Sequence, residues 1–284
     1  MEALNILSID VEDWYHILDV ASAPKREEWE GLPSRVEPAF LRILDVVEER
    51  GARCTCFFLG WVAQRYPRLV REAVERGHER ASHGLAHELV YTQTRPQFLT
   101  DITEAKKILE DLAGKKVEGY RAPGFSVTEQ TPWFFETLAE AGYRYDSSVF
   151  PTTRGHGGMR GAPAIPYSVT TPAGEVREYP ISTATRWGKR YCFSGGGYFR
   201  LFPYRWIAYE SRRLNRKGLP VIVYLHPREA DPEHPRLPMK WTRLFKSYVN
   251  LQGSMKKLSR LLGEFAFTSF AGYRQKEAER ERSE

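Results

Sequence analysis

The sequence is poor in three features that would place a chain of 284 residues in a special class: cysteine, long apolar runs and charge of one sign. Three cysteines are too few for a disulfide framework. No run of 18 or more apolar residues is present, which excludes a membrane-spanning helix. The first residues form a strand-like segment and lack the basic, apolar and small-residue order of a signal peptide. We therefore expect a cytoplasmic globular protein without a transmembrane segment.

The charge balance is mildly basic, with 42 Lys and Arg against 36 Asp and Glu and a net charge of +6. Such a chain could bind nucleic acid, an anionic membrane surface or an acidic polymer. The basic residues are spread along the chain, apart from a short cluster at 212–217 on a predicted helix, which a solvated helix face explains. We expect no nucleic-acid partner.

The remaining composition is typical of a packed enzyme, with 42% hydrophobic and 13% aromatic residues. Up to about residue 148, short apolar runs alternate with amphipathic helical stretches, as in repeated βα units. Leu4–Ile9 is predicted as the first strand. Ser34 and Glu37 have capping-box spacing and predict a helix that stops at Gly51. The sequence therefore predicts the α/β class.

Residues 147–202 differ from this pattern because they are rich in Gly, Pro and aromatic residues. Such a stretch is either a set of functional loops or a small irregular β subregion inserted on the scaffold. We expect it to contribute to a substrate groove. Helical and strand patterns then return, and 275–284 is a charged tail. Without internal repeats or a linker, we expect one domain over 1–274.

Carboxylates and histidines gather where predicted strands end. Asp10, Glu12 and Asp13 follow the first strand, where three carboxylates favour a cation or a general base, although a solvated turn would also accommodate them. His83 and His87 are spaced i and i+4, so a helical turn would place both imidazoles on one face, able to chelate one ion.

A further histidine, His226, ends the apolar strand pattern that begins at Val221. A single such histidine can also be purely structural. Together, one or two carboxylates and two histidines make a three-ligand site with an open position, which is typical of catalytic zinc. Asp10 and His226 then remain as candidate base and acid.

Five segments in this order resemble the motifs of polysaccharide deacetylases, the NodB-homology enzymes of carbohydrate esterase family 4. They are Asp10-Val11-Glu12-Asp13, His83-Gly84-Leu85-Ala86-His87, Arg121-Ala122-Pro123-Gly124, Asp146-Ser147-Ser148 and Leu225-His226. The Gly-Gly-Gly-Tyr-Phe-Arg stretch at 195–200 and His226-Pro227-Arg228-Glu229 further resemble the subgroup linked to exosortase and exopolysaccharide gene clusters. The resemblance implies a distorted single-domain (β/α) barrel that hydrolyses the acetamide of an N-acetylhexosamine.

The resemblance also implies a role for each matching residue. Asp10 matches the general base and His226 the general acid that protonates the departing amine. His83 and His87 match the metal histidines. Arg121 matches the arginine that orients the base. Asp146 matches the carboxylate that holds the catalytic histidine. The metal and a backbone N–H after Pro123 would stabilise the oxyanion.

Two departures from the family pattern affect the ligand and substrate assignments. Val11 occupies the position of the second adjacent carboxylate. If the strand pleat persists, Glu12 shares the face of Asp10, so we favour Glu12 as the ligand and keep Asp13 as the alternative. The family commonly has an aromatic residue at the position of Gly124. Phe125 is the candidate replacement, and we expect the substrate to lie along 123–125.

The resulting hypothesis is a metal-dependent N-deacetylase that acts on a polysaccharide or a glycan precursor. Zinc is the expected ion, although cobalt, nickel or iron would suit the same donors. Two alternatives stay open at this point: an amidohydrolase of small non-sugar substrates on the same scaffold, and a catalytically silent glycan-binding protein.

Overall fold

The computed structural model describes residues 3–152 and 157–282 and divides the chain into two compact units. The first is Met1–Thr55, Gly77–Glu79 and Phe193–Glu284, and the second is Cys56–Arg76 and Arg80–Cys192. Part of the predicted insertion (153–156) and the end of the predicted tail (283–284) lie outside the described residues. That 1–274 forms one domain stays a prediction.

The first unit is built on a buried parallel strand. β1 (Leu4–Val11) pairs on one side with β10 (Ile222–Leu225) and on the other with β11 (Ala266–Thr268), both parallel to it. The apolar run of β1 explains this position, since a parallel strand is covered on both faces. The predicted first strand is confirmed and extends two residues further than expected.

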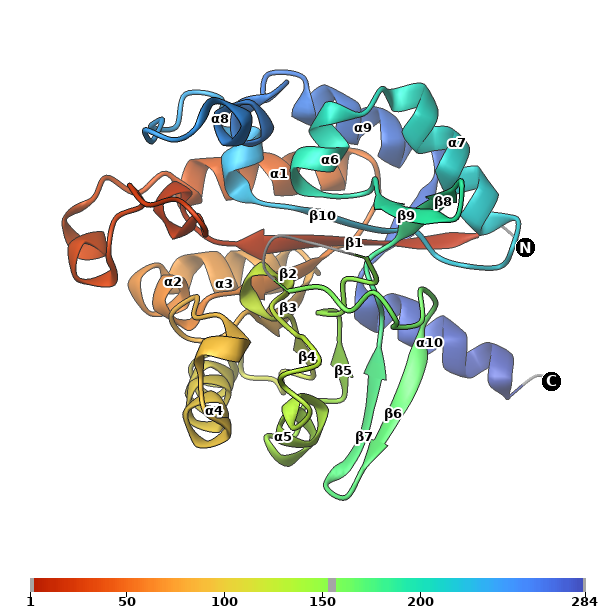
Figure 1. Cartoon of the computed structure of the whole chain (residues 1–284), viewed down its shortest axis with the longest axis horizontal. Helices are drawn as coiled ribbons and strands as arrows, with labels where there is room; N and C mark the ends of the chain where they lie inside the picture. The colour runs from red at the N-terminus through yellow and green to blue at the C-terminus, as the bar shows by residue number, and fades with distance from the viewer. Residues whose placement is uncertain (1–2, 153–156, 283–284) are drawn as a thin grey trace. The chain divides into compact units, whose positions relative to one another are not determined.

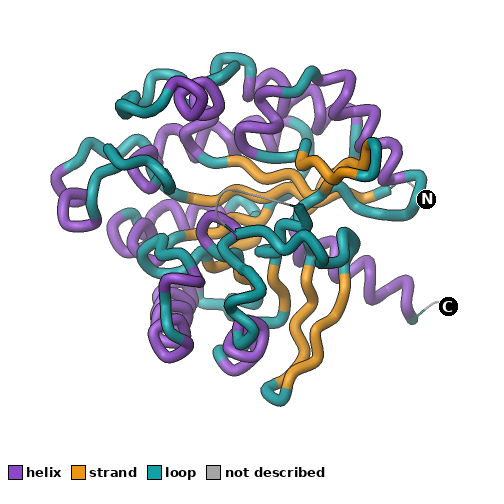
Figure 2. Tube along the Cα trace, viewed as in Figure 1, coloured by secondary structure: helices purple, strands orange, loops and turns teal. Residues whose placement is uncertain are grey.

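Helices surround these strands in the first unit (Figure 2). They are α1 (Val36–Glu49), α6 (Gly196–Leu201), α7 (Tyr204–Asn215), α8 (Trp241–Tyr248), α9 (Ser254–Glu264) and α10 (Phe270–Glu281). Three short 3-10 turns are η1 (Trp14–His16), η2 (Arg26–Gly31) and η5 (Pro227–Ala230).

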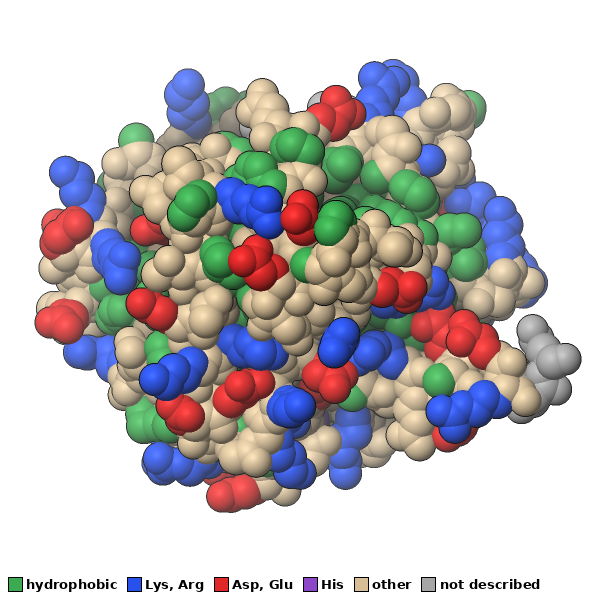
Figure 3. Space-filling model, turned by 90° about the horizontal axis from the view of Figure 1, so that it is seen from below, with side chains coloured by type: hydrophobic (Ala, Val, Ile, Leu, Met, Phe, Trp, Pro, Cys, Tyr) green, Lys and Arg blue, Asp and Glu red, His purple; other side chains and the backbone are tan. Residues whose placement is uncertain are grey.

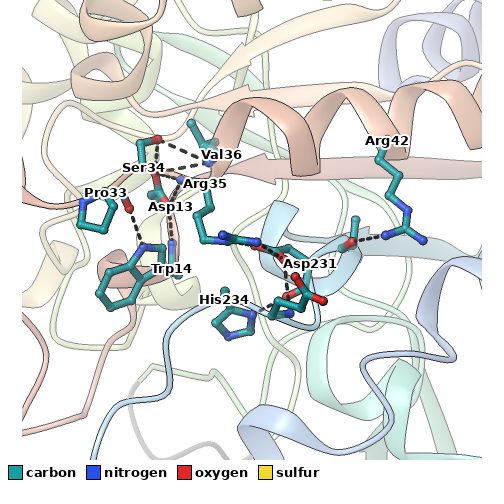
Figure 4. Close-up of polar contacts among 11 residues, drawn as sticks. Asp13, Trp14, Pro33, Ser34, Arg35, Val36, Arg42, Asp231 and His234 are labelled. Atoms are coloured by element: carbon teal, nitrogen blue, oxygen red, sulfur yellow. Dashed lines mark hydrogen bonds and ion pairs between the residues drawn. The ribbon is translucent and has the colours of Figure 1, made fainter.

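The start of α1 differs from the predicted capping box. The helix begins at Val36, and its N-cap residue, Arg35, makes no side-chain cap hydrogen bond. The backbone N–H groups of Arg35 and Val36 instead donate to the Asp13 carboxylate at 3.1 and 3.4 Å, and the Ser34 hydroxyl also donates to it (Figure 4). The capping-box prediction was wrong because a carboxylate distant in sequence provides the cap. The predicted end is confirmed, since Gly51 follows the helix with φ +63°.

The second unit contains the strand order β2-β3-β4-β5-β7-β6. Strands β3 to β5 and β7 are parallel, and β6 runs antiparallel to β7. Their bounds are β2 (Thr55–Phe58), β3 (Glu79–Ser82), β4 (Gly119–Tyr120), β5 (Tyr145–Asp146), β6 (Tyr167–Thr171) and β7 (Gly174–Glu178). The helices are α2 (Gly60–Arg65), α3 (Pro67–Glu75), α4 (Arg95–Ala113) and α5 (Phe134–Glu140), with turns η3 (Val90–Thr92) and η4 (Pro123–Phe125).

The glycine-rich and aromatic stretch holds two β-hairpins. One is β6–β7, drawn in green in Figure 1, and the other is β8 (Thr183–Arg186) with β9 (Lys189–Cys192). Of the two interpretations given for this stretch, the β subregion is therefore the one that the described residues show. Because β7 also pairs in parallel with β5, the first hairpin extends the main sheet. Parallel strands together with helices confirm the α/β class.

Charged side chains of both signs are interspersed on the face drawn in Figure 3, where Lys and Arg lie among Asp and Glu. This agrees with the even spread of basic residues along the sequence. Among the described helices, none combines the length and the apolar character that crossing a membrane requires.

Candidate active site

The end of β1 and the residue after β10 place three candidate residues together in the first unit. Asp10 and Glu12 are both buried, and their carboxylates lie beside the same imidazole. The His226 Nε2 atom is 3.7 Å from Asp10 Oδ2 and 3.8 Å from Glu12 Oε1. The sequence assigned Glu12 to the side of Asp10, and the structure shows both carboxylates reaching one edge of His226.

Asp13 has a different environment from its two neighbours. Its carboxylate accepts hydrogen bonds from the backbone N–H of Trp14 at 2.9 Å and from the donors at the start of α1 (Figure 4). Burial raises the pKa of the Asp13 carboxyl, and the hydrogen bonds from Ser34, Trp14 and Arg35 oppose that rise. The Asp13 oxygens therefore stabilise two helix starts in the first unit.

The opposite edge of His226 contacts a carboxylate that sequence reasoning did not select. His226 Nδ1 is 3.8 Å from Glu229 Oε1, and the same oxygen is 3.3 Å from Arg200 Nε. Both Glu229 and Arg200 are fully buried. The available signal was the i, i+3 spacing in His226-Pro227-Arg228-Glu229, since the Glu229 carboxylate also accepts from the His226 backbone N–H.

These contacts shift the pKa values of both His226 and Glu229. Burial disfavours charge on His226, but the carboxylates of Glu12, Glu229 and Asp10 outweigh burial and raise the pKa of the imidazole. Burial alone would raise the pKa of Glu229, but His226 and Arg200 lower it. A protonated imidazole between carboxylates is suited to donating a proton.

In the second unit, His83 and His87 lie in a loop, so the predicted helical turn was wrong. Gly84 has φ +78° and His87 has φ +58°, and these left-handed residues bend the chain after β3. The imidazoles are nevertheless close, with ring centroids 5.3 Å apart, and both residues are buried. The loop thus achieves the proximity that helical spacing was expected to provide. A left-handed non-glycine residue is often found at a functional site.

The orientation of His83 is suited to metal binding. Its Nδ1 donates to the backbone carbonyl of Arg121 at 2.7 Å, which fixes the tautomer whose Nε2 presents a lone pair. Arg121 is itself fully buried, donates from Nε to the Ser147 carbonyl at 3.1 Å and lies 4.2 Å from the centre of the Phe57 ring. The motifs around His83, Arg121 and Ser147 are therefore linked within the second unit.

Asp146 lies beside a second buried carboxyl group. It is opposite Glu178 in the β5–β7 register and accepts from the Ser148 N–H and hydroxyl at 3.0 and 2.6 Å. Burial raises the pKa of Asp146, and burial together with the neighbouring Asp146 charge raises that of Glu178 well above its ordinary range. Of the two carboxyl groups, Glu178 is therefore the one whose surroundings favour the protonated form more strongly.

The predicted substrate segment forms the turn η4. Gly124 and Phe125 both have positive φ, at +63° and +53°. Phe125 is 3% exposed, and its ring packs 5.7 Å from that of Phe150. The buried ring leaves little surface for stacking on a sugar, and the substrate role of Phe125 stays a prediction. Pro123 and Gly124 stay predictions.

Comparison with known proteins gives two family matches. Residues 33–145 match the family described as polysaccharide deacetylase, and residues 147–275 match a domain of unknown function, DUF3473. Over residues 33–145 the chain is therefore similar to polysaccharide deacetylases. The second match fits the exopolysaccharide-associated subgroup of these deacetylases, as the resemblance of the sequence implied.

Curated relatives match part of the chain. A peptidoglycan-N-acetylglucosamine deacetylase of Bacillus cereus is 30% identical over 103 residues, which is 36% of this chain and 46% of the relative. A peptidoglycan deacetylase of Helicobacter pylori is 28% identical over 108 residues, which is 38% and 36% of the two chains. The matched region thus spans less than half the length of these relatives.

Solved structures of related fold cover more of the chain. The peptidoglycan deacetylase PdaC from Bacillus subtilis gives a TM-score of 0.52 at 13% identity over 99% of this chain and 95% of that one. Puue allantoinase gives 0.60 at 18% identity over 91% and 83%. These similarities show the fold alone, and it agrees with the fold class predicted from the sequence.

Proposed function

We propose that the polysaccharide deacetylase domain makes this chain a metal-dependent hydrolase that removes N-acetyl groups from N-acetylhexosamine residues of a polysaccharide or glycan precursor. The observation that carries the proposal is the His226 imidazole, which is 16% exposed and lies within 4 Å of the Asp10 and Glu12 carboxylates at the end of β1. Amide hydrolysis needs a proton acceptor for water and a proton donor for the departing nitrogen. This group of residues provides one of each.

We assign the metal ligands to Glu12, His83 and His87. They supply one carboxylate and two imidazoles, a donor set that could hold an ion. Asp13 is the weaker candidate because backbone donors already occupy its oxygens. A bound divalent ion would polarise the acetyl carbonyl and lower the pKa of water. Zinc suits these donors best, and cobalt, nickel and iron are further candidates.

The remaining residues take the following roles in the proposal. Asp10 accepts the proton of the attacking water, and Arg121 orients Asp10. His226 donates a proton to the amine nitrogen, and its Nε2 atom lies beside the carboxylates of Asp10 and Glu12. Two carboxylates support His226: Glu229, which contacts Nδ1, and Asp146, which the family pattern supplies.

The test begins with metal content and deacetylation of N-acetylglucosamine oligomers, measured after chelation and after readdition of single metals. His83→Ala and His87→Ala should each abolish bound metal and turnover together. Glu12→Gln and Asp13→Asn form a matched pair, since each removes one neighbouring charge. We expect Glu12→Gln to lose the metal, whereas Asp13→Asn should keep it and lower only the free energy of unfolding, by about 1–2 kcal/mol as for a lost helix cap.

The acid and base are tested separately from the ligands. Asp10→Asn and His226→Ala should keep stoichiometric metal and lower kcat roughly 10²- to 10⁴-fold, the usual contribution of a positioned acid or base. Turnover of small amides without turnover of any glycan would contradict the proposal and favour the alternative, an amidohydrolase of small non-sugar substrates. If the metal-loaded wild type binds glycans but hydrolyses neither small amides nor glycans, the protein is a glycan-binding protein without catalytic activity.

A further inference from the structure

Helix α8 in the first unit has the reverse of the usual distribution of apolar and polar residues. Trp241, Leu244 and Phe245 have i, i+3, i+4 spacing, which normally marks the buried face of a helix. Here they are 78%, 37% and 52% exposed, whereas the buried residue of the helix is Ser247. The hydrophobic stripe of α8 thus faces solvent, and isolated exposed apolar residues do not explain a stripe of this kind.

Helix α6 contacts α8, exposes apolar residues of its own and holds α8 in place. Tyr198 and Leu201 of α6 are also exposed, and α6 contacts α8 (Figure 1). The buried Arg200 guanidinium donates to the carbonyls of Ser247 at 2.7 Å and Lys246 at 3.2 Å. These bonds satisfy carbonyls at the C-terminal end of α8, so the helix is fixed to the unit with its apolar stripe outward.

The sequence segment that contains α8 is basic. Residues 235–263 contain no Asp or Glu and seven Lys or Arg. Lys240 lies just before the helix and Lys246 in its last turn, and both are exposed. An aromatic and aliphatic stripe flanked by lysines is the composition of helices that lie in the interface of an anionic membrane.

We propose that α8, with Tyr198 and Leu201, docks this protein on an anionic lipid surface, where the apolar stripe enters the acyl boundary and the lysines contact lipid headgroups. A second copy of the chain is a poorer occupant, because a symmetric contact would bring Lys240 and Lys246 against the like charges of the partner. A neutral glycan would explain the aromatic rings but neither Leu244 nor the excess of lysine. The proposal does not depend on the deacetylase activity.

The test is cosedimentation of the full chain with phosphatidylglycerol–phosphatidylcholine vesicles and with phosphatidylcholine vesicles. We expect binding to the anionic vesicles only, weakening as salt is raised. Trp241→Ser combined with Phe245→Ser should lower the partition coefficient by about tenfold or more. Lys240→Gln combined with Lys246→Gln should lower it roughly fivefold per charge.

Trp187→Ser is the matched control, because Trp187 is 89% exposed but lies in the β8–β9 turn of the second unit. It should bind vesicles like the wild type, and an unchanged Tm would show that every variant is folded. No binding of the wild type to anionic vesicles would overturn the proposal. So would an equal loss in the Trp187→Ser control, or α8 variants that keep vesicle binding but lose self-association or glycan binding.

Discussion

Two fully buried glutamates, one in each unit, have opposite protonation behaviour. Glu229 lies between the His226 imidazole and the Arg200 guanidinium, which lower its pKa. Glu178 lies beside Asp146, and burial together with that neighbouring carboxylate raises its pKa well above the ordinary range. Burial is the same for the two side chains, at 0% exposure, so the partners decide the charge.

The difference gives the two glutamates different tasks near the candidate catalytic residues. An ionised Glu229 can hold the imidazolium form of His226. A protonated Glu178 can donate a hydrogen bond and so stabilise the ionised form of Asp146. One carboxyl group therefore acts through its charge and the other through its proton, and four experiments separate these roles.

The largest effect on stability is expected from Arg200→Met, which removes the cation that distinguishes Glu229 from Glu178. Glu229 would then lose its buried guanidinium partner, and the backbone carbonyls of Lys246 and Ser247 would lose their donor. We expect a loss of about 3–5 kcal/mol in the free energy of unfolding, measured with denaturant. Arg212→Met is the control, because its exposed ion pair with Glu264 contributes about 1 kcal/mol or less. Equal losses of unfolding free energy in the two variants would show that Arg200 contributes no more to stability than an exposed ion pair does.

Glu229→Gln keeps the shape of the side chain and removes its charge. Arg200 would be left as a buried cation without its carboxylate, so we expect a loss of roughly 2–4 kcal/mol. Turnover should also fall with bound metal retained, since His226 loses the carboxylate at Nδ1. The measurement is denaturant unfolding together with kcat at saturating substrate. A variant with wild-type stability and turnover would show that the contact is incidental.

Glu178→Gln should have a much smaller effect at neutral pH. An amide replaces a carboxyl group that already carries a proton, and its NH₂ can still donate to Asp146. We expect a change below about 1 kcal/mol, because no buried charge is left unpaired. A loss as large as that of Glu229→Gln would mean that Glu178 is ionised in the folded protein.

The pH dependence distinguishes the two glutamates by sign. Above the ordinary value of 4.5, the unfolded chain ionises Glu178 while the folded chain keeps it protonated, so this residue makes stability fall as pH rises toward its folded pKa. Between pH 4.5 and the folded pKa of Glu178, the free energy of unfolding of Glu178→Gln should therefore rise relative to that of the wild type. The rise is at most about 1.4 kcal/mol per pH unit. Glu229 behaves in the opposite way, since its stabilisation is present above 4.5 and is lost as pH falls through its lowered folded pKa. Unfolding curves at several pH values measure both differences.

Several features were predictable because they depend on near neighbours in sequence. The apolar run before Asp10 predicted β1, the Gly51 stop predicted the end of α1, and the alternation of apolar and amphipathic stretches predicted the α/β class. The order of motifs indicated the family that the comparisons then matched. The inferences about strands and helices use residues that are adjacent or one helical turn apart, where strand pleat and helix period directly relate sequence to geometry.

The tertiary structure alone decided which partner each polar group meets. Asp13 caps α1 from 22 positions away, and Glu229 meets Arg200 from a separate helix. The same holds for the apolar stripe of α8. Its helical periodicity alone would predict a buried face, but in the folded chain the buried residue of this helix is Ser247. The physical reason is that charge state and burial depend on groups brought close by the folded chain. Sequence spacing determines the face on which a side chain lies, but only folding determines what that face contacts.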